Sequence, residues 1–296
     1  FLALGLGVER DEAGNVLARF GPADSVAAEA NRPVVVIAHL DSVFPEDTPI
    51  EVRREGKRIL APGITDNARG LAAMIAVANA ILDARVKTIR PVVFVATVGE
   101  EGNGDLRGTK HLFRPGSPLL RAAAVLVVDG AGDTRIVNRA VGSTRLRVTL
   151  AGPGGHSWAD RGQPNPAHAL ARAVAKIGEL RPSEKDVAYS VNVGRIGGGT
   201  SVNSIPEEVW FELDLRADHE PALTWLEAEA VHAIDTAAAR ENGQVDNRQR
   251  LRPRVERIGS RPCGALAEDA PIVQAVAAVT RHFGLEPEFV ASSTDA

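Results

Sequence analysis

The chain has 296 residues, of which 44% are hydrophobic, and its 34 lysines and arginines against 38 aspartates and glutamates give a formal net charge of −4. This length exceeds the usual size of one domain, so we expect two domains, each with a packed core. Acidic and basic residues are interspersed along the chain, which argues against a nucleic acid or an anionic membrane surface as a partner.

Cysteine usage and hydropathy bear on the compartment. The single cysteine, Cys263, excludes an internal disulfide and predicts a reducing, cytoplasmic setting. The longest apolar stretches are far shorter than a membrane span, so we expect a soluble protein. The chain begins at Phe1 rather than Met and ends in Ala-Ser-Ser-Thr-Asp-Ala, so both ends are expected to be cut.

The first part of the chain alternates strand and helix patterns. Apolar runs at Pro33–Ala38, Pro91–Val98 and Ala124–Val128 are expected to be buried strands, and Ala68–Ala84 is expected to be a helix packed on them. Another helix is expected after Gly108. This alternation predicts an α/β fold with a mostly parallel sheet covered by helices on both faces.

After about Val141 the pattern changes to alternating apolar and polar residues. The expected order is β-α-β-β-α-β, a ferredoxin-like α+β arrangement inserted into the first domain. We therefore predict three segments: 1–140 as the first part of a catalytic domain, 141–260 as a lid or dimerisation domain, and 261–296 as an incomplete return to the catalytic domain. The expected elements are strands at 144–150, 188–196, 208–217 and 252–258, helices at 166–180, 221–241 and 270–283, and a last strand from Glu288.

Each of the three buried runs ends in residues that can bind a metal. His39 and Asp41 follow the first, Glu100 and Glu101 the second, and Asp129 the third. The carboxyl ends of strands in an open α/β sheet converge on one crevice, so these side chains are expected to meet there. With Asp66, from a loop before a helix, they would form a two-metal carboxylate cluster, which predicts a metal-dependent hydrolase.

Each of these residues has a simpler interpretation when taken alone. Asp66 could equally cap the following helix, and Asp129 could be a hydrogen-bonded turn residue. His39 and Asp41 share one face of a strand end, where Asp41 could orient the imidazole, but such a pair also occurs in ordinary turns. The adjacent Glu100 and Glu101 are more informative, because one can bind a metal while the other acts as general base.

The inserted domain offers three residues that could contact a substrate. His156 lies in a glycine-rich loop and could donate to a developing oxyanion, or it could be an exposed turn residue. Asn203 belongs to a second glycine-rich loop, which precedes a strand and is therefore better suited to a hairpin or substrate loop than to phosphate binding. Arg216 could hold a substrate carboxylate, or it could pair with Asp214 or Asp218. The remaining histidines are interpreted as structural or surface residues: His111, His168, His219, His232 and His282.

Taken jointly, these motifs resemble the M20 family of zinc-dependent metallopeptidases and deacylases. The motifs are Ala-His39-Leu-Asp41, Gly-Ile-Thr-Asp66-Asn, Gly-Glu100-Glu101-Gly, Val-Asp129-Gly, Gly-Gly-His156-Ser and Thr-Ser-Val-Asn203-Ser-Ile-Pro. The Gly-Asp-Leu-Arg-Gly segment and the closing Ser-Ser-Thr-Asp-Ala are most similar to peptidase T-like members, with glutamate carboxypeptidase-like members as the alternative.

The resemblance implies hydrolysis of amide bonds in small peptides or N-acyl amino acids. It implies two Zn²⁺ ions, with Mn²⁺ or Co²⁺ also possible, and a zinc-activated water for which Glu100 is the general base. Asp66 would bridge the metals, Asp41 would orient His39, and the lid would form a homodimer and bring His156, Asn203 and Arg216 to the substrate. The implied metal ligands are His39, Asp66, Glu101 and Asp129.

The sequence departs from the family pattern at its end. Family members supply a further histidine to the site that holds the equivalent of Glu101, and no such histidine follows the Ser-Thr-Asp-Ala stretch, so we expect weak binding of the second metal. Two alternatives remain open. One is a non-catalytic peptide-binding fragment that lacks a complete metal site, and the other is an M28-type aminopeptidase, against which the inserted lid counts.

Overall fold

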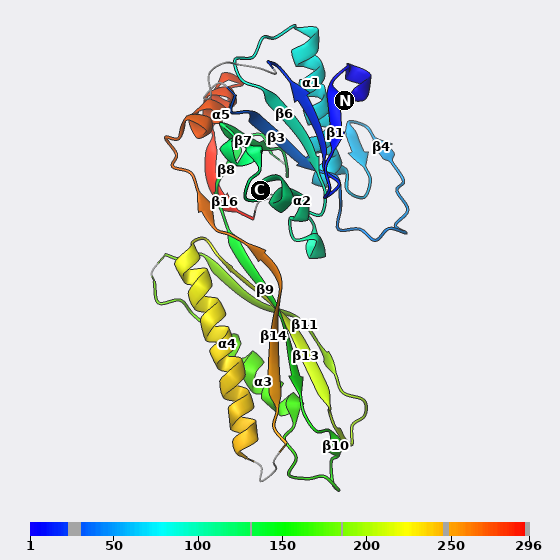
Figure 1. The fold of residues 1–296 in the computed structure, drawn as a ribbon, viewed down its shortest axis with the longest axis vertical. Coiled ribbons are helices and arrows are strands. Elements are labelled where there is room, and N and C mark those ends of the chain that lie inside the picture. The colour runs from blue at the N-terminus through cyan, green and yellow to red at the C-terminus, as the bar shows by residue number, and fades with distance from the viewer. Residues whose placement is uncertain (23–30, 131, 185, 245–248, 294–296) are drawn as a thin grey trace. The chain divides into compact units, whose positions relative to one another are not determined.

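The computed structural model describes residues 1–22, 31–130, 132–184, 186–244 and 249–293. They form a mixed α/β structure that divides into two compact units. Unit 1 comprises Phe1–Arg135 and Gln274–Glu288, and unit 2 comprises Ile136–Val273 together with residues 289–293. Each unit has its own sheet (Figure 1). Each also has its own hydrophobic core.

Unit 1 is built on a five-stranded sheet in the order β1-β2-β6-β3-β7. The central strand β3 runs parallel to both β6 and β7, as the three apolar runs predict. The β1–β2 hairpin adds antiparallel to β6, so the sheet is mixed rather than mostly parallel. Its strands are β1 (Gly7–Arg10), β2 (Val16–Phe20), β3 (Val34–His39), β6 (Val92–Thr97) and β7 (Ala124–Val127).

Both faces of the central strands β3 and β6 are covered, which explains why these two strands are continuous apolar runs. Successive residues of β6 point to opposite faces: Phe94 packs with Met74 of α1 on one face, and Val95 packs with Leu112 of α2 on the other. The α-helices of unit 1 are α1 (Arg69–Asp83), α2 (Arg107–Leu112) and most of α5 (Pro271–His282). A small hairpin is formed by β4 (Arg53–Glu55) and β5 (Arg58–Leu60).

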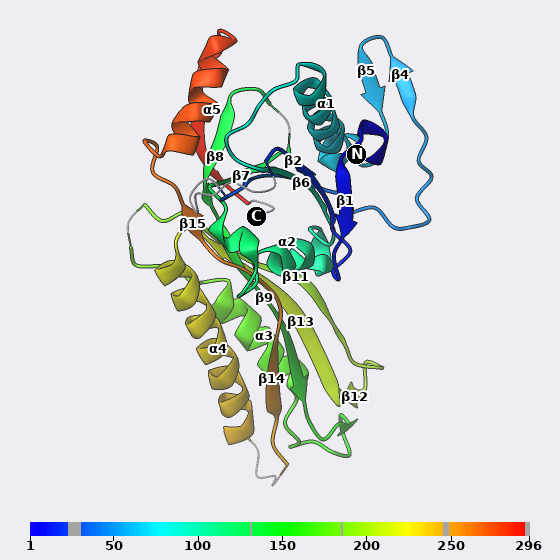
Figure 2. The same ribbon diagram turned by 45° about the horizontal axis from the view of Figure 1, so that its top comes forward.

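Unit 2 contains a four-stranded antiparallel sheet in the order β11-β13-β9-β14. One face packs against the two helices and carries the alternating apolar residues of β13, among them Phe211, Leu213 and Leu215. The opposite face of β13 carries mostly charged side chains that are partly exposed, so the alternation seen in the sequence corresponds to one buried and one partly exposed face. The long helix α4 runs beside the sheet in both views (Figures 1 and 2).

The elements of unit 2 follow the β-α-β-β-α-β order expected from the sequence. They are β9 (Gly142–Ala151), α3 (Pro166–Ile177), β11 (Tyr189–Gly198), β13 (Glu208–Ala217), α4 (Glu220–Gly243) and β14 (Arg252–Arg261). Two smaller sheets accompany them: β10 (Gly155–His156) with β12 (Ser204–Ile205), and β8 (Arg135–Ala140) between β15 (Gly264–Ala265) and β16 (Glu288–Ser292).

The last segment of the chain is divided between the two units. Residues Gln274–Glu288 belong to unit 1, but β16 pairs with β8 and falls within unit 2. The closing Thr-Asp-Ala of the sequence lies outside the described residues. Across the described ranges, every helix is too short or too polar to cross a bilayer.

Candidate metal centre

The candidate ligands of unit 1 converge because three neighbouring parallel strands end together. His39 is the last residue of β3 and is paired in register with Thr97, the last residue of β6. On the other side of β3, Ile37 is in register with Val127, the last residue of β7. The chain then continues from β6 to Glu100 and Glu101 and from β7 to Asp129, so these carboxylates come to the same edge of the sheet as His39.

His39 is fixed in one tautomer. Its side chain is 1% exposed, and Nδ1 lies 2.9 Å from the backbone carbonyl of Asp41, which can only accept a hydrogen bond. Nδ1 therefore carries a proton. On the other side of the ring, Nε2 lies 2.7 Å from Oδ1 of Asp66. If the imidazole is neutral, Nε2 of His39 and Oδ1 of Asp66 are both hydrogen-bond acceptors, so a proton or a metal cation must lie between them.

Two groups of potential ligands share this imidazole. One is His39 with Glu100 and Glu101, and the other is His39 with Asp66 and Asp129; within each group the ligand atoms lie within 4.8 Å of one another. Nε2 of His39 also lies 3.7 Å from Oδ1 of Asp129. The predicted ligands are thus brought together around one histidine, which is the only imidazole in either group over the residues that the structure describes.

Asp41 acts on a different partner from the one expected. Its Oδ1 is 3.9 Å from Nδ1 of His39, too far for a hydrogen bond, and its backbone carbonyl orients the ring instead. The carboxylate accepts from the backbone N–H of Glu100 at 3.1 Å and from that of Glu101 at 2.9 Å. Asp41 therefore fixes the imidazole through its backbone and the backbone at Glu100 and Glu101 through its side chain.

The electrostatics of the cluster suit a divalent cation. Burial, reinforced by the neighbouring carboxylates of Glu100 and Asp66, raises the pKa of Glu101 to about 7. Its Oε1 is buried and has no hydrogen-bond partner among the described residues. A carboxylate oxygen without a partner, crowded by like charges and facing an imidazole nitrogen, is the environment that a bound cation neutralises. The residues present therefore fit a metal.

Asn67, which the sequence analysis passed over, joins two of the ligand loops. Its side chain is buried, accepts from the Gly70 N–H at 3.1 Å and donates to the Val128 carbonyl at 2.8 Å. The loop that carries Asp66 is thereby tied to the residue before Asp129. A Cβ on Gly70 would lie 2.0 Å from Oδ1 of Asn67 and 2.5 Å from the Val128 oxygen, so glycine is required there.

In unit 2, two of the three predicted substrate contacts lie together. β10 and β12 pair His156 with Ser204, and the Ser157 N–H donates to the Asn203 carbonyl at 3.0 Å. Nδ1 of the exposed His156 accepts from two backbone N–H groups, those of Trp158 at 3.2 Å and Ala159 at 3.3 Å. The proton of the neutral ring is therefore on Nε2, which leaves His156 a hydrogen-bond donor.

Arg216 lies elsewhere in unit 2. It is near the end of β13, eight residues beyond Glu208, where β13 begins close to β12; at the rise of an extended strand this is roughly 26 Å. Its Nε donates to Oδ2 of Asp214 at 2.7 Å, the ion pair weighed as the simpler interpretation. One small substrate therefore cannot contact Arg216 and Asn203 of the same unit 2.

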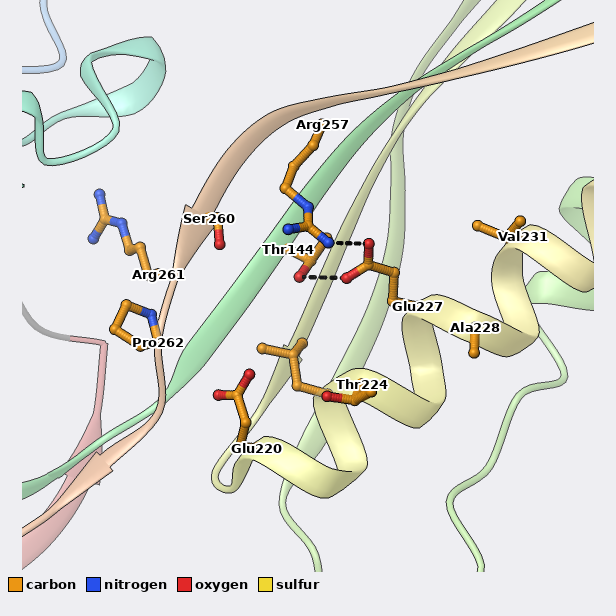
Figure 3. Close-up of a pocket in the computed structure, with 11 residues that line it drawn as sticks. Thr144, Glu220, Thr224, Glu227, Ala228, Val231, Arg257, Ser260, Arg261 and Pro262 are labelled. Carbon is orange, nitrogen blue, oxygen red and sulfur yellow. Dashed lines mark hydrogen bonds and ion pairs between the residues drawn. The ribbon is translucent and has the colours of Figure 1, made fainter.

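Unit 2 also contains a cavity of about 640 Å³ between α4 and the strands β9 and β14. At its centre, Glu227 accepts from the Thr144 hydroxyl at 3.2 Å and pairs with Arg257 (Figure 3). Thr144, Glu227 and Arg257 therefore bind one another through a hydrogen bond and an ion pair. The cavity contains none of the predicted site residues.

The chain is similar in sequence to one curated protein. The chain is 26% identical over 217 residues to the uncharacterized protein YqjE of Bacillus subtilis (strain 168), which covers 71% of this chain. The match takes in 55% of YqjE, so the chain spans about half the length of this curated relative.

Several solved structures share the fold. The aminopeptidase PepT of Bacillus cereus ATCC 10987 superposes with a TM-score of 0.76 at 20% identity, covering 99% of this chain and 76% of PepT. A tripeptidase of Staphylococcus aureus subsp. aureus Mu50 gives 0.78 at 22% identity, covering 99% and 77%. Human carnosine dipeptidase 1 gives 0.69 at 14% identity, covering 99% and 77%.

The family model for peptidase family M20/M25/M40 matches residues 35–296, which include all of the candidate ligands and both glycine-rich loops of unit 2. The chain belongs to the peptidase family M20/M25/M40.

Proposed function

We propose that the chain carries the metal centre of an amidohydrolase that acts on small peptides or N-acyl amino acids. The observation that carries this proposal is the convergence of carboxylates on His39, whose Nε2 lies 2.7 Å from Oδ1 of Asp66 and which groups both with Glu100 and Glu101 and with Asp66 and Asp129. Asp66 would bridge two cations, with His39 and Asp129 on one and Glu101 on the other. Zn²⁺ is the favoured ion, and Mn²⁺ or Co²⁺ also suits these ligands.

When bound, such ions supply Lewis acidity to the scissile amide and to the attacking water. The protein's own residues do the rest. Glu100 is 6% exposed and its backbone is anchored by Asp41, so its carboxylate can take a proton from water and deliver it to the leaving amine. His156, a donor at Nε2, would bind the developing oxyanion, and Asn203 would contact the substrate from the adjoining loop.

Unit 1 would then be the catalytic domain and unit 2 a lid and dimerisation domain. The separation of Arg216 from His156 and Asn203 supports a homodimer, because the two ends of unit 2 could then serve different active sites. A mass measurement in solution tests this directly: a monomer at all concentrations would contradict it. The cytoplasm remains the proposed compartment, on the basis of cysteine usage alone.

The two glutamates provide the decisive test of the roles. We expect Glu100→Gln to retain metal and lose turnover, because it removes the base, and Glu101→Gln to lose metal, because it removes a ligand. Metal content and hydrolysis of dipeptides, tripeptides and N-acetyl amino acids should be measured on the same preparations. Full turnover by Glu100→Gln would refute the base assignment.

A second outcome is favoured by one observation: His39 is the only imidazole of the described cluster. If the chain binds peptides at equilibrium, holds at most one zinc and hydrolyses none of the substrates, it is a peptide-binding module rather than an enzyme.

A further inference from the structure

A buried asparagine outside the metal centre closes the base of the loop that carries Glu100 and Glu101. The flanks of this loop meet directly, because the Gly108 N–H donates to the Val98 carbonyl at 2.9 Å. Asn15, just before β2, joins both flanks. Its Oδ1 accepts from the Val98 N–H at 3.1 Å and its Nδ2 donates to the Gly108 carbonyl at 3.0 Å. The three bonds form a closed ring.

The orientation of this side chain is fixed. Asn15 is 0% exposed, and its Nδ2 also donates to Oδ2 of Asp11 at 2.7 Å. Oδ1 of Asp11 in turn accepts from the backbone N–H groups of Gly14 and Asn15, both at 2.9 Å. Exchanging the oxygen and nitrogen of the amide would place its NH₂ against the Val98 N–H and its oxygen against an acidic oxygen. Only one arrangement satisfies every partner.

Gly108 leaves the space that the ring of hydrogen bonds occupies. A Cβ there would lie 2.3 Å from Oδ1 of Asn15 and 2.5 Å from the Val98 oxygen. Real Cβ atoms do not approach so closely, so any other residue would push the amide out of the ring. The ring therefore depends on Asn15 for its hydrogen bonds and on Gly108 for its space.

The loop needs such a constraint. It contains glycines at 99, 102 and 104, which give the unrestrained backbone high conformational entropy. Asp41 anchors the loop at Glu100 and Glu101 through their backbone N–H groups, and the ring joins the two flanks of the loop. With the backbone held at both places, the two glutamates start from fixed backbone positions before any ligand binds.

We propose that Asn15 is a positioning residue for the metal centre, acting through the 98–108 loop and supported by Asp11 and Gly108. For the role of the two glutamates this inference rests on the proposed function. Asn15 itself binds neither metal nor substrate in this account, and it precedes the part of the chain that matches the family model.

Amide hydrogen exchange of the metal-free chain tests the positioning without depending on metal. Asn15→Ala and Gly108→Ala should each speed exchange of the loop amides by about tenfold or more, most of all at positions 98 and 108, whose N–H groups donate within the ring. Asn138→Ala is the matched control: Asn138 is also buried and donates to a backbone carbonyl, that of Leu266 at 2.9 Å, but it lies in unit 2. Exchange across 98–108 should be unchanged in the control.

Titration with Co²⁺, followed by its visible absorption, tests the consequence. Loss of a ligand's own hydrogen-bond partner typically weakens metal affinity by about 10–100-fold. Because the ring bonds the loop backbone rather than a ligand, we expect a loss near the lower end of that range for both ring variants and none for Asn138→Ala. Unchanged exchange across 98–108 in both folded ring variants would overturn the proposal, as would faster exchange with unchanged cobalt affinity. If the unaltered chain binds no cobalt, the proposed function fails, while exchange still decides whether Asn15 holds the loop.

Discussion

Glu101→Gln should stabilise the metal-free chain at alkaline pH. The pKa of Glu101 is raised from 4.5 to about 7, so the folded state holds a proton that the unfolded state releases. The contribution of Glu101 to the free energy of unfolding is therefore highest below the unfolded pKa of 4.5, falls as the pH rises through the folded pKa of about 7, and stays at the lower value above it. Glutamine does not ionise, so the free energy of unfolding of the Glu101→Gln variant does not fall in this way as the pH rises.

The size of the effect follows from the shift. One pKa unit corresponds to about 1.4 kcal/mol, so a shift of this size would amount to roughly 3 kcal/mol for a group without solvent contact. Glu101 is only half-buried, and solvent screens part of the repulsion from Glu100 and Asp66. We therefore expect Glu101→Gln to raise the free energy of unfolding by about 1–2 kcal/mol at pH 8 and to leave it unchanged near pH 4.5.

Urea unfolding in the presence of a chelator, at pH 4.5 and pH 8, measures both values. Glu55→Gln, on the exposed hairpin strand β4, is the control and should change neither. Added Zn²⁺ should reverse the order at pH 8, because a ligand stabilises only the form that binds it. A gain in Glu101→Gln that is the same at both pH values, or a loss at pH 8, would refute the reasoning.

Three further substitutions test other parts of the structure. Gly70→Ala would force a Cβ against Asn67, which should lower the free energy of unfolding by about 1–3 kcal/mol and weaken metal binding. Calorimetry with Zn²⁺ measures the affinity, and unchanged zinc binding would contradict this prediction. Phe211→Ala, in the core of unit 2, should lower the free energy of unfolding in urea by about 3–5 kcal/mol and leave the cobalt affinity of the folded chain unaltered. A parallel loss of cobalt affinity would show that the metal centre depends on that core. Arg172→Met removes the guanidinium that pairs with the buried Glu241 and should lower the free energy of unfolding by about 2–3 kcal/mol. A melting temperature equal to that of the unaltered chain would show that the pair contributes nothing to stability.

The parts of the structure that the sequence predicts are those set by local periodicity. Continuous apolar runs indicate strands buried on both faces, and alternation indicates strands with one wet face; β13 was predicted at its observed bounds of Glu208–Ala217. Convergence of His39, Glu100 and Asp129 at one sheet edge follows from parallel pairing of their strands.

What periodicity could not predict depends on contacts between distant residues. The ring contacts of Asn15 join residues 83 and 93 positions apart, and nothing near Asn15 in the sequence indicates them. The carboxylate of Asp41 was expected to face His39, two residues away, but it reaches Glu100 and Glu101 instead. The antiparallel β1–β2 hairpin was also missed, because its strands are short and only partly apolar.

The central claim is that this edge of unit 1 binds divalent metal between His39 and the surrounding carboxylates. A crystal structure of the chain grown with Zn²⁺, with anomalous data collected at the zinc edge, tests it most directly. The account predicts an anomalous peak about 2.0–2.2 Å from Nε2 of His39 and from a carboxylate oxygen of Asp66. Zinc bound elsewhere, with Nε2 of His39 still in direct contact with Asp66, would contradict it.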